Sequence, residues 1–149
     1  MVFTRRLANG YLISDRKAAL DLDMIHHYLS TESYWAQNRS RDITLAAISG
    51  SLCLGLYASD GSQAGFARVV TDRATMAHLS DVFVLTEHRG HGVGEAMVKA
   101  LLDHPALKTV RRWTLSTADA HGLYAKFGFA AFSEPEKQMI RMAPHHHNP

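Results

Sequence analysis

The chain has 149 residues, of which 46% are hydrophobic and 20% are charged, and this composition is typical of one folded globular domain and excludes a disordered or fibrous chain. Sixteen lysines and arginines against 14 aspartates and glutamates give a formal net charge of +2, too even a balance for nucleic acid or an anionic membrane to be the main partner. The single cysteine, Cys53, excludes an intramolecular disulfide and a structural zinc site held by cysteines.

The sequence contains neither a targeting segment nor a linker. No apolar segment follows residues 1–6, and no stretch approaches the roughly 18 apolar residues of a membrane span, so we expect neither secretion nor membrane insertion. The lone cysteine fits a reducing cytoplasm. Without internal repeats or low-complexity linkers, residues 1–143 are expected to form one domain, followed by a disordered, histidine-containing tail at 144–149.

The order of apolar, polar and turn-forming residues predicts an α/β fold with a mixed sheet covered by helices on both faces. An Asp60-Gly61 pair between two apolar runs is typical of a hairpin. In chain order the predicted elements are a strand at 11–15, helices at 22–29 and 31–37, a loop at 39–42, strands at 51–58, 63–70 and 78–85, a helix at 93–104, a strand at 112–116, a helix capped by Asp119 that stops at Gly128, and strands at 129–133 and 138–142.

The helix at 93–104 has the clearest pattern. Val93, Met97 and Leu101 share its apolar face, while Glu95 and Lys99 are spaced as an i,i+4 ion pair on the other face. Pro105 then ends the helix.

A glycine-rich loop at 86–94 joins the preceding strand to this helix. Its amides lie at the helix N-terminus, where unpaired N–H groups and the helix dipole attract an anion such as a phosphate. A nucleotide P-loop is excluded, because Glu95 and Ala96 follow Gly94 where a lysine and a hydroxyl residue are needed. A dinucleotide-binding fingerprint is excluded as well, since it would need glycine at Glu95 or at Met97.

The run Arg89-Gly90-His91-Gly92-Val93-Gly94 resembles the R/Q-x-x-G-x-G/A motif of the GNAT superfamily of acetyl-CoA-dependent N-acetyltransferases. Residues 81–85 resemble the fourth strand of that family, and residues 119–129 resemble its late helix with a Tyr-x-x-x-Gly-Phe ending. The resemblance implies a mostly antiparallel, twisted sheet of six to seven strands. It also implies that acetyl-CoA donates an acetyl group to a primary amine by direct attack in a ternary complex, without a metal.

The same resemblance implies a set of residues that bind acetyl-CoA. Pantetheine is expected to pair with the strand backbone, and Thr117 stands where the family often has an asparagine that contacts pantetheine. The implied contacts are Phe83, Val84 and Leu85 for pantetheine, and the amides of Arg89, Gly90, His91, Gly92, Val93 and Gly94 for the pyrophosphate.

Amide formation from a thioester needs an acid for the leaving thiolate, an oxyanion donor and a base for the amine. The resemblance implies that Tyr124 is the acid and that a backbone N–H of Phe83 or Val84 binds the oxyanion. Asp81 is the leading candidate for the base, although an aspartate at this position is equally typical of a turn cap. Weaker alternatives for the base are Asp72, Glu32 and His78.

Aromatic and charged residues outside these motifs are candidates for contacting the acceptor. These are Tyr34, Trp35, Arg68 and Asp72. The alternative role is core packing for Tyr34 and Trp35, and a solvated ion pair for Arg68 and Asp72. The histidine spacings match no metal motif, since His26 and His27 are adjacent and point different ways on a helix.

Other activities are left open at this point. An acyl-CoA sensor without turnover and a transferase of a larger acyl group are alternatives, whereas an acyl-enzyme on Cys53 is disfavoured because that residue lies in an apolar strand. A homodimer through the last strands is a further expectation, because Met139, Ile140 and Met142 offer an apolar edge or face.

Overall fold

Six strands form one sheet in the computed structural model, which describes residues 1–144. They follow one another in chain order, and every neighbouring pair is antiparallel except the last, in which β5 and β6 run parallel. The strands are β1 (Thr4–Arg6), β2 (Leu12–Ser14), β3 (Leu52–Tyr57), β4 (Gln63–Thr71), β5 (Met76–Val84) and β6 (Arg112–Leu115).

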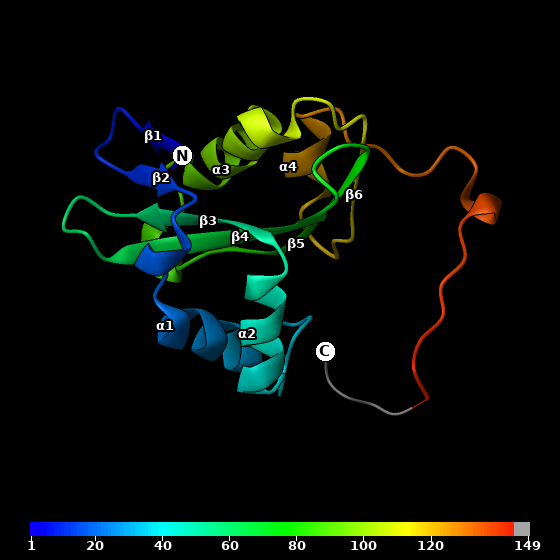
Figure 1. Ribbon diagram of the computed structural model, residues 1–149, viewed down its shortest axis with the longest axis horizontal. Helices are drawn as coiled ribbons and strands as arrows, with labels where there is room; N and C mark the ends of the chain where they lie inside the picture. The colour runs from blue at the N-terminus through cyan, green and yellow to red at the C-terminus, as the bar shows by residue number, and fades with distance from the viewer. Residues whose placement is uncertain (145–149) are drawn as a thin grey trace.

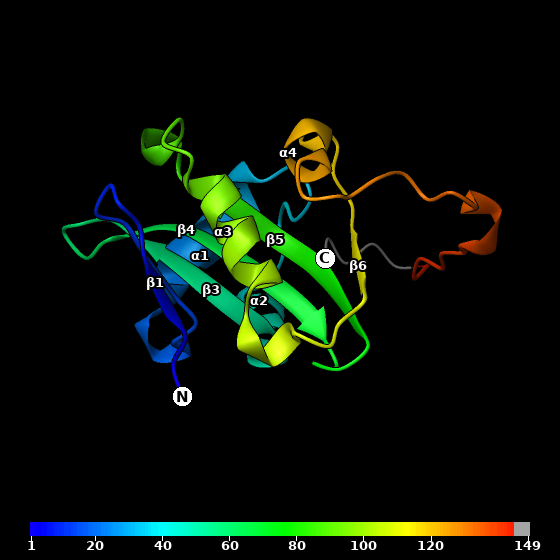
Figure 2. The same ribbon diagram turned by 90° about the horizontal axis from the view of Figure 1, so that it is seen from above.

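Helices cover both faces of this sheet (Figure 1). The helices α1 (Leu22–His27) and α2 (Arg41–Ser49) lie on one face, and α3 (Val93–Leu102) and α4 (His121–Ala125) lie on the other. Seen from above, α3 lies over the middle strands of the sheet and α4 lies near the end of β6 (Figure 2). The predicted mixed, mostly antiparallel sheet with helices on both faces is confirmed.

The sheet separates two apolar clusters. Leu54 and Leu56 of β3 pack toward Met97 and Leu101 of α3, and all four are fully buried. On the other face, the cluster between the sheet and the helices α1 and α2 contains Ile25, Leu29, Phe66 and Phe83. Because β4 and β5 carry apolar side chains into both clusters, the middle of the sheet is a rigid support for the residues at its edge.

The predicted helix at 31–37 is wrong, and the predicted loop at 39–42 ends at Ser40 because Arg41 and Asp42 belong to a helix. The chain forms a short π-helix over Tyr28–Glu32, and the next α-helix is α2 at Arg41–Ser49. Ser40 explains the difference, because its side chain accepts a hydrogen bond from the Ile43 N–H at 3.3 Å. The polar residues before Ile43 are therefore the cap and first turn of a helix.

The predicted strands at 129–133 and 138–142 are also wrong. This part of the chain leaves the sheet as an extended arm, drawn orange to red in Figure 1, with one 3-10 turn at Pro135–Lys137. Met139 and Ile140 are 98% and 86% exposed, so their apolar side chains pack against no part of the described chain. We refer to residues 129–144 as the arm.

Smaller differences concern local contacts and the chain ends. The first strand, β1, was not predicted, and the expected pair of Glu95 with Lys99 is replaced by pairs of Lys99 with Asp103 and of Glu95 with Lys126. No helix within residues 1–144 is both long and apolar enough to cross a membrane. Apart from Pro144, the predicted tail at 144–149 lies outside the described residues.

Candidate active site

A β-bulge bends β5 where it passes Arg68 of β4. Phe83 lies opposite Phe66, and Ser80 lies opposite Arg68. Between these two pairs β5 therefore contains one residue more than β4. Asp81 lies in the bulge with a positive φ of 50°. On the other side of β5, the parallel pairing with β6 ends at Leu79 opposite Leu115. The two strands diverge beyond this point and leave the last residues of β5 with an open edge.

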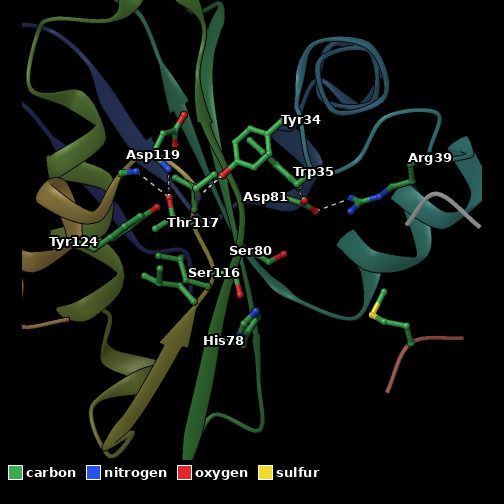
Figure 3. Close-up of a pocket in the computed structure, with 16 residues that line it drawn as sticks. Tyr34, Trp35, Arg39, His78, Ser80, Asp81, Ser116, Thr117, Asp119 and Tyr124 are labelled. Carbon is green, nitrogen blue, oxygen red and sulfur yellow. Dashed lines mark hydrogen bonds and ion pairs between the residues drawn. The ribbon is translucent and has the colours of Figure 1, made fainter. Parts of the chain in front are cut away.

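A cleft of about 730 Å³ lies where the strands diverge. One wall comes from the loop after β6 and from α4, the floor comes from β5, and the other wall comes from the segment between α1 and α2 (Figure 3). The lining residues that carry polar groups of interest are Tyr34, Trp35, Arg39, His78, Ser80, Asp81, Ser116, Thr117, Asp119 and Tyr124.

The open edge of β5 presents one backbone donor beyond the bulge. The Leu85 N–H donates to the Ala64 carbonyl at 2.8 Å, so the same register puts Phe83 in a hydrogen-bonded pair with Phe66. By alternation, the N–H and carbonyl of Val84 point away from β4. Among the three residues predicted to meet pantetheine, Val84 is therefore the one whose N–H faces the open edge.

The glycine-rich loop follows directly and has the predicted character. No backbone N–H of residues 90–95 donates to a described residue, and α3 begins at Val93. Gly90 and Gly92 have φ values of 85° and 72°, and an added Cβ at either would meet no atom within 4 Å. Free amides, a helix N-terminus and open space are together the features of an anion site.

The backbone N–H of Arg89, one of the amides predicted to bind the pyrophosphate, has a partner within the described chain. It donates to the Thr86 carbonyl at 3.3 Å, and the side chain of Arg89 donates to the Val84 carbonyl at 2.9 Å and to the Tyr28 hydroxyl at 3.0 Å. These contacts hold the loop against the end of β5 and leave the amides of residues 90–94 as the predicted phosphate contacts.

Tyr124 of α4 is 8% exposed and lines the cleft. Burial, with smaller contributions from Tyr34 and Asp119, raises the pKa of its phenol, so the hydroxyl keeps its proton at neutral pH. The hydroxyl has no hydrogen-bond partner among the described residues although the ring packs edge-on against Phe129 at 5.8 Å.

Thr117, and not Asp119, fixes the start of α4. The hydroxyl oxygen of Thr117 accepts the N–H of Ala120 at 3.0 Å, whereas Asp119 makes no capping bond. The hydroxyl proton of Thr117 is still free to donate into the cleft, which its side chain lines.

The side chain of Asp81 is 1% exposed, and its carboxylate is held by three donors. Trp35 Nε1 donates to Oδ1 at 2.8 Å, while Arg39 Nη1 and Arg68 Nε donate to Oδ2, each at 2.8 Å. Burial raises the pKa of Asp81, but the hydrogen bond from Arg39 and the charges of Arg68 and Arg39 outweigh it, and the pKa lies below its usual value. An ionised carboxylate held in this way is a poor proton acceptor.

Arg68 lies behind this carboxylate and not on the cleft surface. Its two terminal nitrogens donate to Ser51 and Ser80, each at 3.1 Å, so every nitrogen of its guanidinium has a partner. Arg68 thus supports the wall, in place of the predicted contact with the acceptor. The other predicted acceptor residues, Tyr34 and Trp35, do line the cleft.

Two further predicted residues lie outside the cleft, and one alternative lies inside it. Asp72 organises the turn between β4 and β5 by accepting hydrogen bonds from Ala74 and Thr75, which gives it a structural role and removes it from the acceptor contacts. Glu32 is exposed and does not line the cleft. His78 does line it; its Nδ1 bonds to Thr114 at 2.7 Å, and burial followed by the charge of Arg68 lowers its pKa.

Sequence reasoning missed Arg39, which lies in the segment predicted to be a loop. Arg39 is 8% exposed, lines the cleft and contacts Asp81. A polar run such as Arg39-Ser40-Arg41-Asp42 carries no signal that its first residue is buried. Among residues 1–144 no cluster of histidine, cysteine and carboxylate side chains has the arrangement of a metal site.

Comparisons with known proteins identify the family of this chain. A model of the acetyltransferase (GNAT) family matches residues 22–129. A presumed acetyltransferase of Gibberella zeae is 33% identical over 78% of this chain and 76% of that protein. The crystal structure of a presumed GNAT acetyltransferase from Xanthomonas campestris is 44% identical, with a TM-score of 0.86 over 90% of this chain and 94% of that one. A Mycobacterium tuberculosis protein solved in complex with CoA shares the fold, with a TM-score of 0.61 over 86% of this chain and 71% of that one, at 19% identity.

Proposed function

The chain belongs to the GNAT acetyltransferase family, and from this premise we propose that it transfers the acetyl group of acetyl-CoA to a primary amine by direct attack within a ternary complex. One juxtaposition carries the proposal: the open edge of β5 leads from the cleft beside Tyr124 directly to the free amides at the start of α3. A ligand with a pyrophosphate at one end and a thioester at the other fits this path.

The loop and the strand edge divide the binding of acetyl-CoA between them. The amides of Gly90 to Gly94 would hold the pyrophosphate, which the dipole of α3 further stabilises. The Val84 N–H would pair with pantetheine, or with the thioester carbonyl as charge develops on its oxygen. Thr117 supplies a hydroxyl donor on the facing wall. A structure of a fold relative with CoA supports CoA as the ligand.

Tyr124 would supply the proton that the reaction needs. The amine nitrogen forms its bond to the carbonyl carbon, the carbon–sulfur bond breaks, and the phenol donates its proton to the leaving thiolate. The unpartnered hydroxyl of Tyr124 and its raised pKa support this role, because the phenol enters the reaction protonated.

His78 is the better candidate for removing the amine proton, directly or through a water molecule. Its lowered pKa leaves the ring neutral at pH 7, and its bond to Thr114 uses only Nδ1. Asp81 is disfavoured as the base because three donors already occupy its carboxylate. We assign Asp81 a positioning role, in which it orients Trp35 and Arg39 along the cleft.

An acyl-enzyme route through Cys53 is disfavoured by the position of the thiol. Cys53 is buried in the cluster between the sheet and the helices α1 and α2, outside the cleft. This burial raises the pKa of its thiol to about 11. A thiol with this pKa carries almost no thiolate at neutral pH.

The test is acetyl-CoA binding by calorimetry together with thiol release across a panel of small amines, amino acids and peptides, for the wild type and Tyr124→Phe. Thiol release with an acceptor, strongly reduced in the variant, is the expected result. Absence of acetyl-CoA binding would overturn the proposal. Binding without turnover on any acceptor would favour an acyl-CoA sensor, and turnover only with longer acyl-CoA would favour a transferase of larger acyl groups.

The arm supports a homodimer as the working assembly. Met139 and Ile140 expose apolar side chains on it, Met142 is 70% exposed although it lines the cleft, and the outer edge of β6 has no strand partner within residues 1–144. An arm that crosses to a second copy would cover both features. Light scattering should give the mass of a dimer for the wild type and of a monomer for an Ile140→Glu variant; a monomeric wild type contradicts the assembly.

A further inference from the structure

Two buried arginines share one carboxylate in the wall of the cleft. Arg39 and Arg68 both donate to Oδ2 of Asp81, and all three side chains are at most 12% exposed. The other acidic residue that lines the cleft within residues 1–144 is Asp119, on the opposite wall (Figure 3). The two arginines carry two positive charges and Asp81 carries one negative charge, so the wall around Asp81 has a net charge of +1.

The uncompensated charge belongs to Arg39. Every nitrogen of Arg68 has a partner, whereas Arg39 donates to a described residue only through Nη1. Nε of Arg39 is buried without any hydrogen-bond partner. A buried, unpaired guanidinium donor is costly, so its persistence in the wall of a binding cleft indicates that a ligand completes it.

The free nitrogens of Arg39 select the shape of that ligand. With Nη1 engaged by Asp81, Nε and Nη2 remain, and they form the side edge of the planar guanidinium that matches the two oxygens of a carboxylate. Because Nε is covered, an incoming carboxylate meets Nη2 first and gains the second bond when neighbouring side chains move. A single negative charge balances the single excess positive charge.

Resting on the proposed function, we infer that the acceptor is a small amine that also carries a carboxylate, as an amino acid does, and that Arg39 binds this carboxylate while the amine faces the thioester. Tyr34 and Trp35 then flank the carbon skeleton between the two groups. Both aromatic rings line the same cleft and meet edge-on with a centroid distance of 5.0 Å.

The experiment compares matched acceptors. Each amino acid is assayed beside its C-terminal amide and its decarboxylated amine, and a series from glycine to 5-aminovalerate varies the separation of amine and carboxylate. We expect at least one acid to exceed its amide in kcat/KM by about tenfold or more, the size of a charge-assisted hydrogen bond. Acid-to-amide ratios near one for every acceptor that turns over would overturn the inference and leave the proposed function standing.

Two variants separate Arg39 from the rest of the wall. In Arg39→Gln the acid-to-amide ratio should fall toward one, and in Arg39→Lys it should be partly restored. Arg68→Lys is the matched control, because it disturbs the same carboxylate without touching the free edge, and its ratio should stay that of the wild type. Equal losses of the ratio in Arg68→Lys and Arg39→Gln would contradict the assignment to Arg39. The wild-type ratios decide the inference even if Arg39→Gln fails to fold.

A binding measurement separates failure of the inference from failure of the proposed function. Calorimetry with CoA present titrates each acid and its amide without any need for turnover. Tighter binding of the acid with no acetylation would support the carboxylate site and contradict the transferase. Binding of neither compound and no turnover of any acceptor would contradict both.

Discussion

The hydroxyl of Tyr34 accepts a hydrogen bond from the backbone N–H of Ala118 at 2.9 Å, across the mouth of the cleft. Tyr34 lies between α1 and α2 and Ala118 lies in the loop before α4, so the bond joins two walls that are otherwise separated by the divergence of β5 and β6 (Figure 3). Tyr34 is 55% exposed, so water competes for this hydrogen bond.

Tyr34→Phe removes this bond and keeps the aromatic ring. Since an exposed hydrogen bond contributes about 1 kcal/mol, we expect the KM of the acceptor to rise by about fivefold, with kcat within twofold of the wild type. Steady-state kinetics at saturating acetyl-CoA measure both constants. A fall in kcat at unchanged KM would instead give the hydroxyl a part in the chemical step.

Tyr124→Phe removes the proposed acid without changing the ring packed against Phe129. General acid catalysis contributes about 10²- to 10⁴-fold, so kcat should fall by that factor while the affinity for acetyl-CoA stays the same. Because the pKa of Tyr124 lies above its ordinary value of 10, the wild type should show no loss of activity from phenol ionisation below that pH. An unchanged kcat in the variant contradicts the assignment.

The parts of this site that sequence reasoning found are those that depend on local pattern. The glycine positions, the strand before them and the tyrosine before Gly128 are each set by the backbone of one short segment, and their spacing along the chain carries that information. Arg39 depends on a partner 42 residues away, and neither its spacing nor its neighbours distinguish it from a solvated arginine. The same holds for Arg68, whose three partners come from β5 and the turn before β3.

The arm illustrates a different limit of prediction. Gln138 to Met142 has the composition of a strand, but a strand needs a partner edge as well as suitable residues. Within residues 1–144 no strand pairs with this segment, and its side chains are exposed. Periodicity predicts what a segment is able to form, and the tertiary arrangement decides whether it forms.

His78→Gln and Asp81→Asn test which group removes the amine proton. The pKa of His78 is lowered from 6.5, so the neutral, active form dominates above that pKa and kcat should fall only as the pH drops below it. His78→Gln should lower kcat at neutral pH by about 10²-fold and abolish this acidic limb. The Asp81→Asn variant should still show the fall of kcat at acidic pH. If this fall is absent in Asp81→Asn, Asp81 and not His78 is the base.

Asp81→Asn should also be costly for stability. The substitution leaves two buried arginines around a neutral amide, and breaking a buried ion pair costs about 3–5 kcal/mol. The pKa of Asp81 is lower in the folded state, so its ionised form stabilises the fold at neutral pH and this contribution is lost as the pH falls through the folded pKa. Urea unfolding at several pH values measures both effects. Because Asp81→Asn is expected to be less stable, its kcat is best compared with that of the wild type at low temperature.

Gly92→Ala tests the phosphate site, with Gly61→Ala as its control. Both glycines have positive φ, 72° and 88°, and an added Cβ meets no atom within 4 Å at either position. Each alanine should therefore cost the same backbone strain, about 1 kcal/mol of unfolding free energy. Only the Cβ at Gly92 enters the space before the free amides, so Kd for CoA should rise tenfold or more in that variant alone. An equal Kd in both variants would place the pyrophosphate elsewhere.

Tyr57→Phe should stabilise the protein. The hydroxyl of Tyr57 is buried without a hydrogen-bond partner, and such a group costs about 1–3 kcal/mol. The ring itself must stay, because it covers Gly55, where a Cβ would lie only 2.4 Å from the Tyr57 hydroxyl oxygen. Phenylalanine keeps the ring and removes the unpaired hydroxyl, so the free energy of unfolding should rise by about 1 kcal/mol and Tm by about 2–4 °C.

Tyr57→Phe lies outside the cleft, so its kcat and KM should match those of the wild type. This makes Tyr57→Phe the reference for the other tyrosine variants. A lower Tm would show that the hydroxyl contributes a favourable bond in solution.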